Sequence, residues 1–380
     1  MSWENMKLSV CCVSITDGDH LSPPKAERGI PFVTIANINT TNHFDFSNTM
    51  FVPQEYYDKL DSKRKAQVGD VLYSVVGSFG IPVYIKEHQK FVFQRHIAIL
   101  RPNEKILPRF LYYTMLSRDF YAKADAAAIG AAQRTVSLTA LRNIEIDVPT
   151  IEEQSKIVDI LSAYDDLIEN NQKQIKLLEE AAQRLYKEWF VDLRFPGYEN
   201  TPIIDGVPQG WRKVTLGAIA PILTGKKNAN FGTEDGMYPF FTCSQEPIKA
   251  PSYSFDTSAV ILAGNGDFNV KLYRGRFEAY QRTYVLSPHD DKYLYLLYNA
   301  VNESMAVLVK GASGSTIKFL TKGMIESIPL FIPTDDLLTQ YNSYSETVQQ
   351  KLESLKKTIK NATESRDRLL PKLMSGEIEV

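Results

Sequence analysis

The side chains in this sequence that could do chemistry are mainly cations in predicted loops, with Gly, Asn, Gln or Tyr nearby. Lysine and arginine can neutralise phosphates or bind guanine edges, and Asn and Gln suit adenine. A solvated surface charge is the simpler interpretation of any one position, but the set as a whole predicts contact with DNA. The predicted DNA-binding residues are Lys86, Arg95 and Arg134 in the first half and Lys226, Lys227, Lys271, Arg274, Arg276, Lys310 and Lys318 in the second.

Charge is divided unevenly along the chain, although its net charge is only −2. Residues 63–134 carry twelve Lys or Arg against five acids, residues 212–322 carry thirteen against nine, and residues 152–195 carry six against ten. The two outer segments are therefore basic and the segment between them is acidic. This division suits nucleic-acid contact by the basic segments.

The sequence lacks the motifs of a catalyst. It has no NPPY-like motif for methylating an exocyclic amine, and GASGSTIK at residues 311–318 lacks the lysine placement of a GxxxxGK[ST] phosphate loop. No Ser-His-Asp arrangement and no paired metal carboxylates stand out. Cys11, Cys12 and Cys243 have no CxxC spacing and few His neighbours, which favours plain thiols over zinc ligands. We predict a chain that is not an enzyme and binds neither a metal nor a cofactor itself.

Apolar residues in the middle of the chain follow the alternating 4-3 spacing of a coiled-coil helix. The spacing returns 184 residues later, so we expect the partner helix in the same chain. Asn171 lies on the seam, where it would fix register or orientation. The predicted seam residues are Ile157, Leu161, Ile168, Asn171, Ile175, Leu178 and Leu185 in the first helix and Leu352, Leu355, Ile359 and Leu369 in the second.

The same order of elements is predicted in both halves, which indicates an internal repeat. Val71, Gly77, Phe93, Arg134 and Leu141 match Val260, Gly266, Tyr280, Lys318 and Ile325, at offsets that drift from 189 to 184. Loops at 17–25 and 224–230 open the two halves, and His20 fits either a hydrogen bond within its loop or a base contact. Strands are predicted at 31–38, 68–76, 80–85, 91–100 and 141–148 and at 237–243, 258–263, 270–273, 279–286 and 325–332; helices at 108–128, 292–309 and 335–374; and loops at 130–137 and 311–321.

These elements predict an α+β fold with two similar strand-rich α/β domains, joined by two long helices that form an intramolecular antiparallel coiled coil with pseudo-twofold symmetry. A helix of roughly 39 residues would span about 58 Å, longer than one turn of B-DNA at about 34 Å. No apolar run reaches membrane length and no secretion signal is evident, so we expect a cytoplasmic protein without a membrane partner. The predicted segments are domain 1–149, helix 150–193, linker 194–211, domain 212–333 and helix 334–380.

Three stretches resemble the specificity subunit of type I restriction-modification systems. They are VPTIEEQSKIVDILSAYDDLIENNQKQIKLLEEAAQRLYKEWFVDLRFPGYE (148–199), VPQGWRKVTLGAI (207–219) and RDRLLPKLMSGEIEV (366–380). The resemblance covers the whole chain. It implies two target recognition domains, each of which reads one half of an interrupted double-stranded DNA sequence. It also implies assembly with two adenine-methylating modification subunits and with translocating restriction subunits, which would bind S-adenosylmethionine, ATP and magnesium.

The sequence departs from a perfect repeat in two places. SWENMKLSVCC at residues 2–12 is a weaker version of the GWRKVTLGAI opening, and Leu338 stands where the first repeat has Gln154. We therefore do not expect a contact made by Gln154 to occur twice. Tyr186, Trp189 and Phe190 form an aromatic end to the first long helix, which fits core packing and a docking surface for the modification subunit equally well.

A coiled-coil scaffold or oligomerisation protein without base-specific DNA contact is the alternative hypothesis. It accounts for the heptads but not for two basic domains that repeat at matching positions. A fragment of a single-chain restriction enzyme would require catalytic motifs outside these 380 residues.

Overall fold

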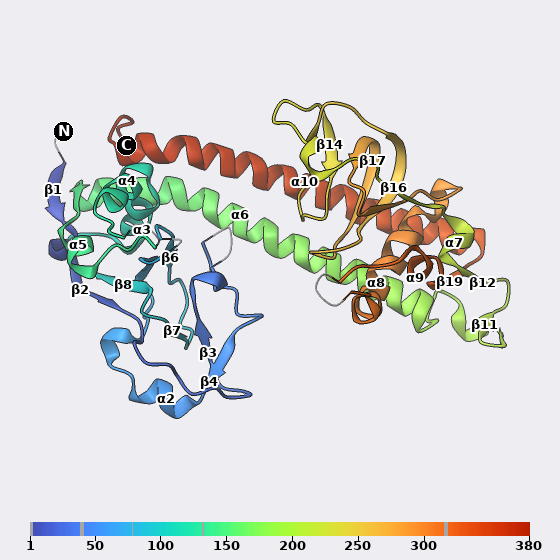
Figure 1. The fold of residues 1–380 in the computed structure, drawn as a ribbon, viewed down its shortest axis with the longest axis horizontal. Helices are drawn as coiled ribbons and strands as arrows, with labels where there is room; N and C mark the ends of the chain where they lie inside the picture. Colours follow the sequence, from blue (N-terminus) through green and yellow to red (C-terminus); the bar gives the residue numbers. More distant parts are fainter. Residues whose placement is uncertain (1–2, 39–41, 78, 131–132, 315–317) are drawn as a thin grey trace. The chain divides into compact units, whose positions relative to one another are not determined.

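A computed structural model describes residues 3–38, 42–77, 79–130, 133–314 and 318–380 (Figure 1). The chain divides into two compact units. Unit 1 comprises Met1–Asn170 with Thr358–Val380, and unit 2 comprises Asn171–Lys357. Each of the two long helices, α6 (Ile151–Tyr186) and α10 (Asp335–Met374), contributes one stretch to each unit.

Unit 1 is built on a four-stranded antiparallel sheet of order β2-β8-β5-β6 and a three-stranded sheet of order β4-β3-β7, with β1 paired to β9. Before α6 its strands are β1 (Glu4–Lys7), β2 (Cys12–Asp17), β3 (Ile30–Val33), β4 (Met50–Val52), β5 (Val71–Ser74), β6 (Pro82–Tyr84), β7 (Val92–Phe93), β8 (Ile97–Pro102) and β9 (Glu145–Val148). Its helices there are α1 (Leu8–Cys11), α2 (Gln54–Lys59), α3 (Pro108–Leu116), α4 (Arg118–Ala126) and α5 (Leu138–Asn143), with short 3-10 turns at Ile35–Asn37 and Ser62–Arg64.

Unit 2 is built on a six-stranded sheet of order β13-β18-β16-β17-β14-β15, with separate pairs β12-β19 and β10-β11. Its strands are β10 (Ile203–Ile204), β11 (Val207–Pro208), β12 (Arg212–Thr215), β13 (Ile222–Thr224), β14 (Tyr238–Phe241), β15 (Ile248–Ala250), β16 (Phe255–Ala263), β17 (Val270–Ala279), β18 (Thr283–Leu286) and β19 (Pro329–Ile332). Its helices, besides the long ones, are α7 (Leu216–Ile219), α8 (Leu294–Gly311), α9 (Lys322–Glu326), a π-helical turn at Lys187–Val191 and 3-10 turns at Tyr198–Asn200, Ala229–Phe231 and Asp291–Tyr293.

The two long helices run antiparallel within the chain, as predicted. In unit 1, Lys156 Nζ donates to the Val380 carbonyl at 3.1 Å, and Arg366 Nη1 donates to Asp165 Oδ1 at 2.8 Å, so residue numbers rise along α6 while they fall along its partner. In unit 2, Tyr341 near the start of α10 packs on the rings that follow α6, with Phe190 4.8 Å away between ring centroids. The twofold relation of the two units stays a prediction.

The start of α6 confirms the predicted capping box. Thr150 N donates to Glu153 Oε2 at 3.1 Å, and Glu153 N donates back to Thr150 Oγ1 at 3.3 Å. This exchange satisfies two backbone donors that the helix leaves unpaired. The predicted bounds of α10, residues 335–374, are also confirmed.

Several shorter elements differ from their prediction because a short helix occupies part of each. The predicted helix 108–128 is two helices, since Ser117 Oγ accepts from Phe120 N and starts α4 afresh. The start of the predicted strand 141–148 belongs to helix α5, which buries Leu141. Likewise, the start of the predicted strand 325–332 belongs to helix α9, which buries Ile325. Apolar spacing alone does not separate a short buried helix from a strand.

Three further predicted strands are broken, and two predicted loops are described only in part. The strand predicted at 91–100 is interrupted by a turn, so Phe93 ends β7 and Ile97 starts β8. The strand predicted at 31–38 ends at Val33, because Thr34 and Asn37 cap a 3-10 turn there. The strand predicted at 279–286 is interrupted by a turn, so Ala279 ends β17 and Thr283 starts β18. Residues 131–132 of the predicted loop 130–137 and residues 315–317 of the predicted loop 311–321 lie outside the described residues.

Candidate nucleic-acid interface

Four loops of unit 1 are joined by backbone hydrogen bonds. Gly18 N donates to Ile97 O at 3.0 Å, which fixes the loop after β2 against the turn before β8. Val75 N donates to His96 O at 2.9 Å and Gly77 N to Arg134 O at 3.0 Å, which adds the loop after β5 and the segment before α5. We call residues 17–20, 75–80, 94–96 and 129–136 the unit 1 loop cluster; of these, residues 78, 131 and 132 lie outside the described part.

Unit 2 repeats this arrangement with other residues. Gly225 N donates to Thr283 O at 3.2 Å, Gly264 N to Arg282 O at 2.8 Å and Leu320 N to Gly264 O at 2.8 Å. The unit 2 loop cluster therefore comprises residues 224–227, 264–268, 280–282 and 313–320, apart from 315–317, which the structure does not describe. Two predicted loops thus meet in each unit, at 17–25 and 130–137 in unit 1 and at 224–230 and 311–321 in unit 2, together with turns at 94–96 and 280–282 that fall inside predicted strands.

One glycine in each cluster permits a close backbone approach. A Cβ on Gly18 would lie 2.2 Å from the Phe93 carbonyl oxygen, and a Cβ on Gly225 would lie 2.0 Å from that of Ala279. No larger residue fits at either position without moving the backbone, because real contacts of this kind do not fall below 3.0 Å. The two clusters therefore depend on the same backbone geometry.

The hydrogen bonds correct one part of the predicted repeat. Ile97 N donates to Gln94 O in unit 1, and Thr283 N donates to Tyr280 O in unit 2, so Gln94 is equivalent to Tyr280. The match of Phe93 with Tyr280 was wrong by one residue, and Arg95 corresponds to Gln281. The matches of Gly77 with Gly266 and of Arg134 with Lys318 agree with the bridges Val76–Thr135 and Asn265–Phe319.

Four of the exposed predicted DNA-binding cations have no carboxylate of the described residues within ion-pair distance. Arg95, Lys226 and Lys318 lie in the loop clusters, and Lys310 lies in the last turn of α8. Lys227 is half-buried, with Nζ 4.3 Å from the centre of the Phe231 ring. None of these five side chains has an ion-pair partner among the described residues.

The other predicted cations, Lys271 apart, are engaged within their own unit. Lys86 contacts Glu169, and its Nζ lies 3.8 Å from Asp166, so α6 offsets its charge. Arg134 lies 3.1 Å from Asp125. Arg274 pairs with Glu346 of α10 at 3.0 Å, and Arg276 pairs with Asp256 at 3.0 Å. Lys86 and Arg274 thus tie a sheet to a long helix, a role that sequence spacing does not show.

Lys271 lies in β17 and is half-buried. Its Nζ donates to the Ser244 carbonyl at 2.8 Å and to Asn269 Oδ1. Burial lowers the pKa of its ammonium, although Glu246 and Asp267 act in the opposite direction. The sequence prediction named Lys271 but not Asn269, Asp267 and Gln245, which lie in two polar segments between predicted strands.

The predicted seam residues divide by burial. Ile157, Leu161, Ile168, Asn171, Leu352 and Leu355 are buried, whereas Ile175, Leu178, Leu185, Ile359 and Leu369 are half-buried. Leu370 next to Leu369 is buried instead, in the unit 1 core with Leu373. Asn171 is 5% exposed, and its Nδ2 has no hydrogen-bond partner among the described residues.

The aromatic residues at the end of α6 lie in the core of unit 2. Tyr186, Trp189 and Phe190 are buried with Trp211 and Tyr341. Burial raises the pKa of the Tyr186 hydroxyl, as expected for a phenol held away from water. Of the two interpretations left open by the sequence, core packing describes these side chains.

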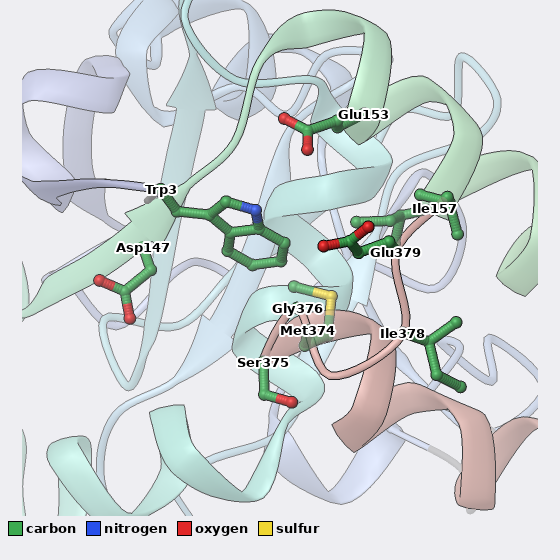
Figure 2. Close-up of a pocket in the computed structure, with 10 residues that line it drawn as sticks. Trp3, Asp147, Glu153, Ile157, Met374, Ser375, Gly376, Ile378 and Glu379 are labelled. Carbon is green, nitrogen blue, oxygen red and sulfur yellow. The ribbon is translucent and has the colours of Figure 1, made fainter. Parts of the chain in front are cut away.

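A cavity of about 360 Å³ in unit 1 lies where the chain turns back after α10. Figure 2 shows the Trp3 indole between Glu153 and Met374, with Glu379 beside Ile157. Glu153 caps α6, and Asp147 accepts from Asn5 at 2.9 Å, so two of its acids already serve the fold. None of the predicted DNA-binding residues lines this cavity.

Two features are absent from the part of the chain that the structure describes. No helix there is long and apolar enough to cross a membrane. No group of three or more His, Cys, Asp or Glu side chains among those residues could hold a metal ion.

The chain matches a known family of proteins in both of its halves. The type I restriction modification DNA specificity domain matches residues 3–180 and 208–364, so the chain belongs to this family and carries two target recognition domains. The resemblance found in the sequence is thereby confirmed.

Similar proteins include two curated specificity subunits and one solved structure. The type I restriction enzyme EcoDI specificity subunit of Escherichia coli is 37% identical over 176 residues, which cover 45% of this chain and 39% of that protein. The MjaIX specificity subunit of Methanocaldococcus jannaschii is 26% identical over 307 residues, covering 73% of this chain and 71% of that protein. The crystal structure of a type I restriction-modification system S subunit from M. genitalium has the same fold, with a TM-score of 0.62 at 17% identity over 98% of this chain and 96% of that one.

Proposed function

We propose that this chain is the DNA-reading subunit of a type I restriction-modification complex and that each loop cluster reads one half of a two-part target. The observation that carries the proposal is the duplication of one backbone arrangement with different side chains. A shared frame gives both domains the same approach to a duplex, and different side chains let them select different bases.

Within each recognition domain, different residues are proposed to contact phosphates and bases. Arg95, Lys226 and Lys318 are exposed and without ion-pair partners in the described residues, so they suit phosphates and set the position of each domain. Side chains held on strands or by hydrogen bonds suit bases, since base discrimination requires fixed geometry. The first set supplies affinity and the second set supplies specificity.

The long helices are proposed to set the number of unread base pairs between the half-sites. α6 has 36 residues and α10 has 40. At about 1.5 Å per residue, helices of this length extend roughly 54–60 Å, more than one turn of duplex. Because the helices pair within the chain, their length would be a property of one molecule.

Catalysis is proposed to belong to partner subunits. Two modification subunits would methylate adenine with S-adenosylmethionine, and restriction subunits would use ATP and magnesium for translocation and cleavage. The relatives named above are called specificity subunits, and the sequence motifs for these chemistries are lacking. We place the complex in the cytoplasm, where its DNA substrate is present.

The decisive experiment maps methylated adenines by single-molecule sequencing in a host that expresses the modification subunit with and without this chain. We expect a gapped, two-part methylated motif that requires this chain. Methylation of an uninterrupted motif, or methylation independent of the chain, contradicts the proposal.

A second experiment tests the role of helix length. We insert one heptad into α6 and one into α10, which preserves the pairing of their seams. The spacer in the methylated motif should change while the letters of both half-sites stay the same. An unaltered spacer in a folded variant shows that helix length does not set it.

The scaffold hypothesis makes a different prediction for the isolated chain. A protein whose coiled coil joins separate chains would be a dimer or larger. The pairing of α6 with α10 inside one chain supports a monomer instead. Native mass measurement distinguishes the two hypotheses, because the scaffold hypothesis predicts a dimer or larger and the proposed function predicts a monomer.

A further inference from the structure

Lys271 occupies a sheet position where unit 1 has a core valine. Lys271 pairs with Ile261 of β16, which in turn pairs with Val285 of β18. In unit 1, Val83 pairs with Leu72 of β5, which pairs with Ile99 of β8. Val83 is 2% exposed and packs in an apolar cluster. A lysine at the equivalent position loses part of its hydration, so the fold alone gives no reason for it.

A network of hydrogen bonds holds the Lys271 ammonium in place. It donates to the Ser244 carbonyl and to Asn269 Oδ1, and Asn269 Nδ2 donates to the Cys243 carbonyl at 3.0 Å. Gln245 Nε2 donates to Asp267 Oδ2 at 2.6 Å. The segment after β14 and the loop before β17 are therefore joined by side chains beside the unit 2 loop cluster.

The ammonium keeps one donor available within this network. A lysine ammonium has three N–H donors, and two of them have partners in the described residues. Because Lys271 stands on a strand and two uncharged acceptors hold its ammonium, the third donor has a fixed direction, and no carboxylate of the described residues lies within ion-pair distance of it. This differs from Arg274 and Arg276, whose guanidinium groups are paired with carboxylates.

The surrounding charge favours a base edge over a phosphate. Glu246 and Asp267 are exposed acids in the same two segments as Ser244 and Asn269, which hold the Lys271 ammonium, and Asn269 Nδ2 also donates to the Asp267 backbone carbonyl at 2.6 Å. Such acids would repel a phosphate, whereas a carboxylate can accept a hydrogen bond from the cytosine amino group. A lysine donor beside a carboxylate acceptor matches the major-groove edge of a guanine–cytosine pair, where O6 and N7 accept and N4 donates.

We propose that Lys271, positioned by Asn269, donates to guanine in the half-site that unit 2 contacts, and that Asp267 accepts from the paired cytosine. This inference rests on the proposed function, because it assigns one letter of a target that the loop clusters read. Asn269 is a positioning residue, since it acts through Lys271.

The test compares methylation motifs and DNA affinity for the chain assembled with its modification subunits. Lys271→Met should make one guanine–cytosine position of one half-site degenerate, with discrimination at that position reduced about tenfold or more. Lys271→Arg should retain the preference for guanine, because arginine also donates to O6 and N7. Asp267→Asn should weaken selection at the same position.

Lys226→Met is the matched control, because Lys226 is an exposed cation of the same loop cluster. It should weaken binding to all sequences alike and leave the motif unchanged. Thermal unfolding of each variant identifies any loss that comes from misfolding.

The outcomes separate this inference from the proposed function. An unchanged motif in a folded, methylating Lys271→Met complex overturns the inference and leaves the proposed function intact. Equal loss of specificity at many positions in both Lys271→Met and Lys271→Arg also overturns it, because a purely structural lysine predicts that result. Failure of the unsubstituted complex to produce a two-part motif contradicts the proposed function itself.

Discussion

Val83 of unit 1 and Lys271 of unit 2 stand at equivalent sheet positions, but their surroundings differ in kind. Around Val83, Phe44 and Phe46 pack on Phe91, with ring centroids 5.3 Å and 5.8 Å apart. Around Lys271, Asn269 and the chain after β14 form a polar network. The backbone hydrogen bonds of the neighbouring loops are nevertheless the same in both units. The same backbone arrangement therefore accommodates either an apolar or a polar set of side chains at this position.

The residues that attach each unit to its long helices also differ between polar and apolar side chains. In unit 1, Gln154 is fully buried, accepts from Leu107 N at 2.7 Å and donates to the Lys105 and Pro149 carbonyls at 3.0 Å each. In unit 2, Leu338 fills that place with an apolar side chain, and Asn342 one turn later donates to the Lys292 carbonyl. The contact made by Gln154 therefore does not occur twice, as the sequence predicted.

The largest effect should come from the two close-approach glycines. Gly18→Ala and Gly225→Ala each force a Cβ against a backbone carbonyl, and we expect each to destabilise its own unit by about 3 kcal/mol or more. Hydrogen exchange resolved by peptide reports the two units separately. Gly323→Ala is the control, since its Cβ would meet nothing within 4 Å. If only one of the two loop clusters is disturbed by its substitution, the clusters do not share one frame.

Exchange of the attachment residues should have the next largest effect. Gln154→Leu leaves a buried amide donor and two carbonyls without partners, so we expect a loss of about 2–3 kcal/mol in unit 1. Leu338→Gln should also destabilise unit 2, because it buries an amide within an apolar cluster. Urea unfolding measures both. Exposed Gln340→Leu, the control, should stay within about 0.5 kcal/mol.

Two tyrosines donate a hydrogen bond to a carboxylate of a long helix, and removal of their hydroxyls should lower stability by unequal amounts. Both tyrosines are buried, but Tyr113 donates at 2.6 Å to Asp165, whose side chain is 16% exposed, and Tyr295 donates at 2.7 Å to Glu346, whose side chain is 39% exposed. Removing the hydroxyl should cost about 2 kcal/mol in Tyr113→Phe and about 1 kcal/mol in Tyr295→Phe. Tyr121→Phe serves as the control. Equal costs at both sites would show that burial does not distinguish them.

The Tyr295 contact should also depend on pH. The hydrogen bond from Tyr295 holds the pKa of Glu346 below its ordinary value. A carboxyl whose pKa is lowered by folding contributes stability that is present above the unfolded pKa and is lost as pH falls through the folded pKa. The difference in stability between the wild type and Glu346→Gln should therefore be present at pH 7 and shrink on acidification to about pH 3. A difference that grows on acidification contradicts this assignment.

The smallest effect should come from the ion pairs that tie Lys86 and Arg109 to α6. Arg109 lies 2.7 Å from Asp166, whose side chain is 57% exposed, and Lys86 shares that carboxylate. Exposed pairs contribute little, so Lys86→Ala should change stability by roughly 0.5 kcal/mol, and salt should reduce that change. If Lys86→Ala instead lowers DNA affinity strongly without affecting stability, then Lys86 contacts DNA as the sequence suggested.

Several features followed from the sequence because they depend on neighbours in the chain or on regular spacing. The capping box at Thr150, the bounds of α10 and the seam positions Ile157 and Leu161 were predicted from local pattern. The repeat was found from matching residues at a nearly constant offset, although a single-residue shift near Phe93 escaped notice. Local pattern missed the short helices α5 and α9 because a buried turn and a strand place apolar residues at similar spacing.

Only the tertiary structure decided which cations are paired with carboxylates and which are not. Lys86, Arg274 and Lys271 look alike in the sequence, yet the first two meet carboxylates of a long helix and the third meets carbonyl oxygens beside a loop cluster. Local periodicity sets the helices and their seam, because backbone hydrogen bonding and side-chain spacing act over a few residues. The partner of a charged side chain comes from a segment tens of residues away, so its electrostatic role exists only once the chain has folded.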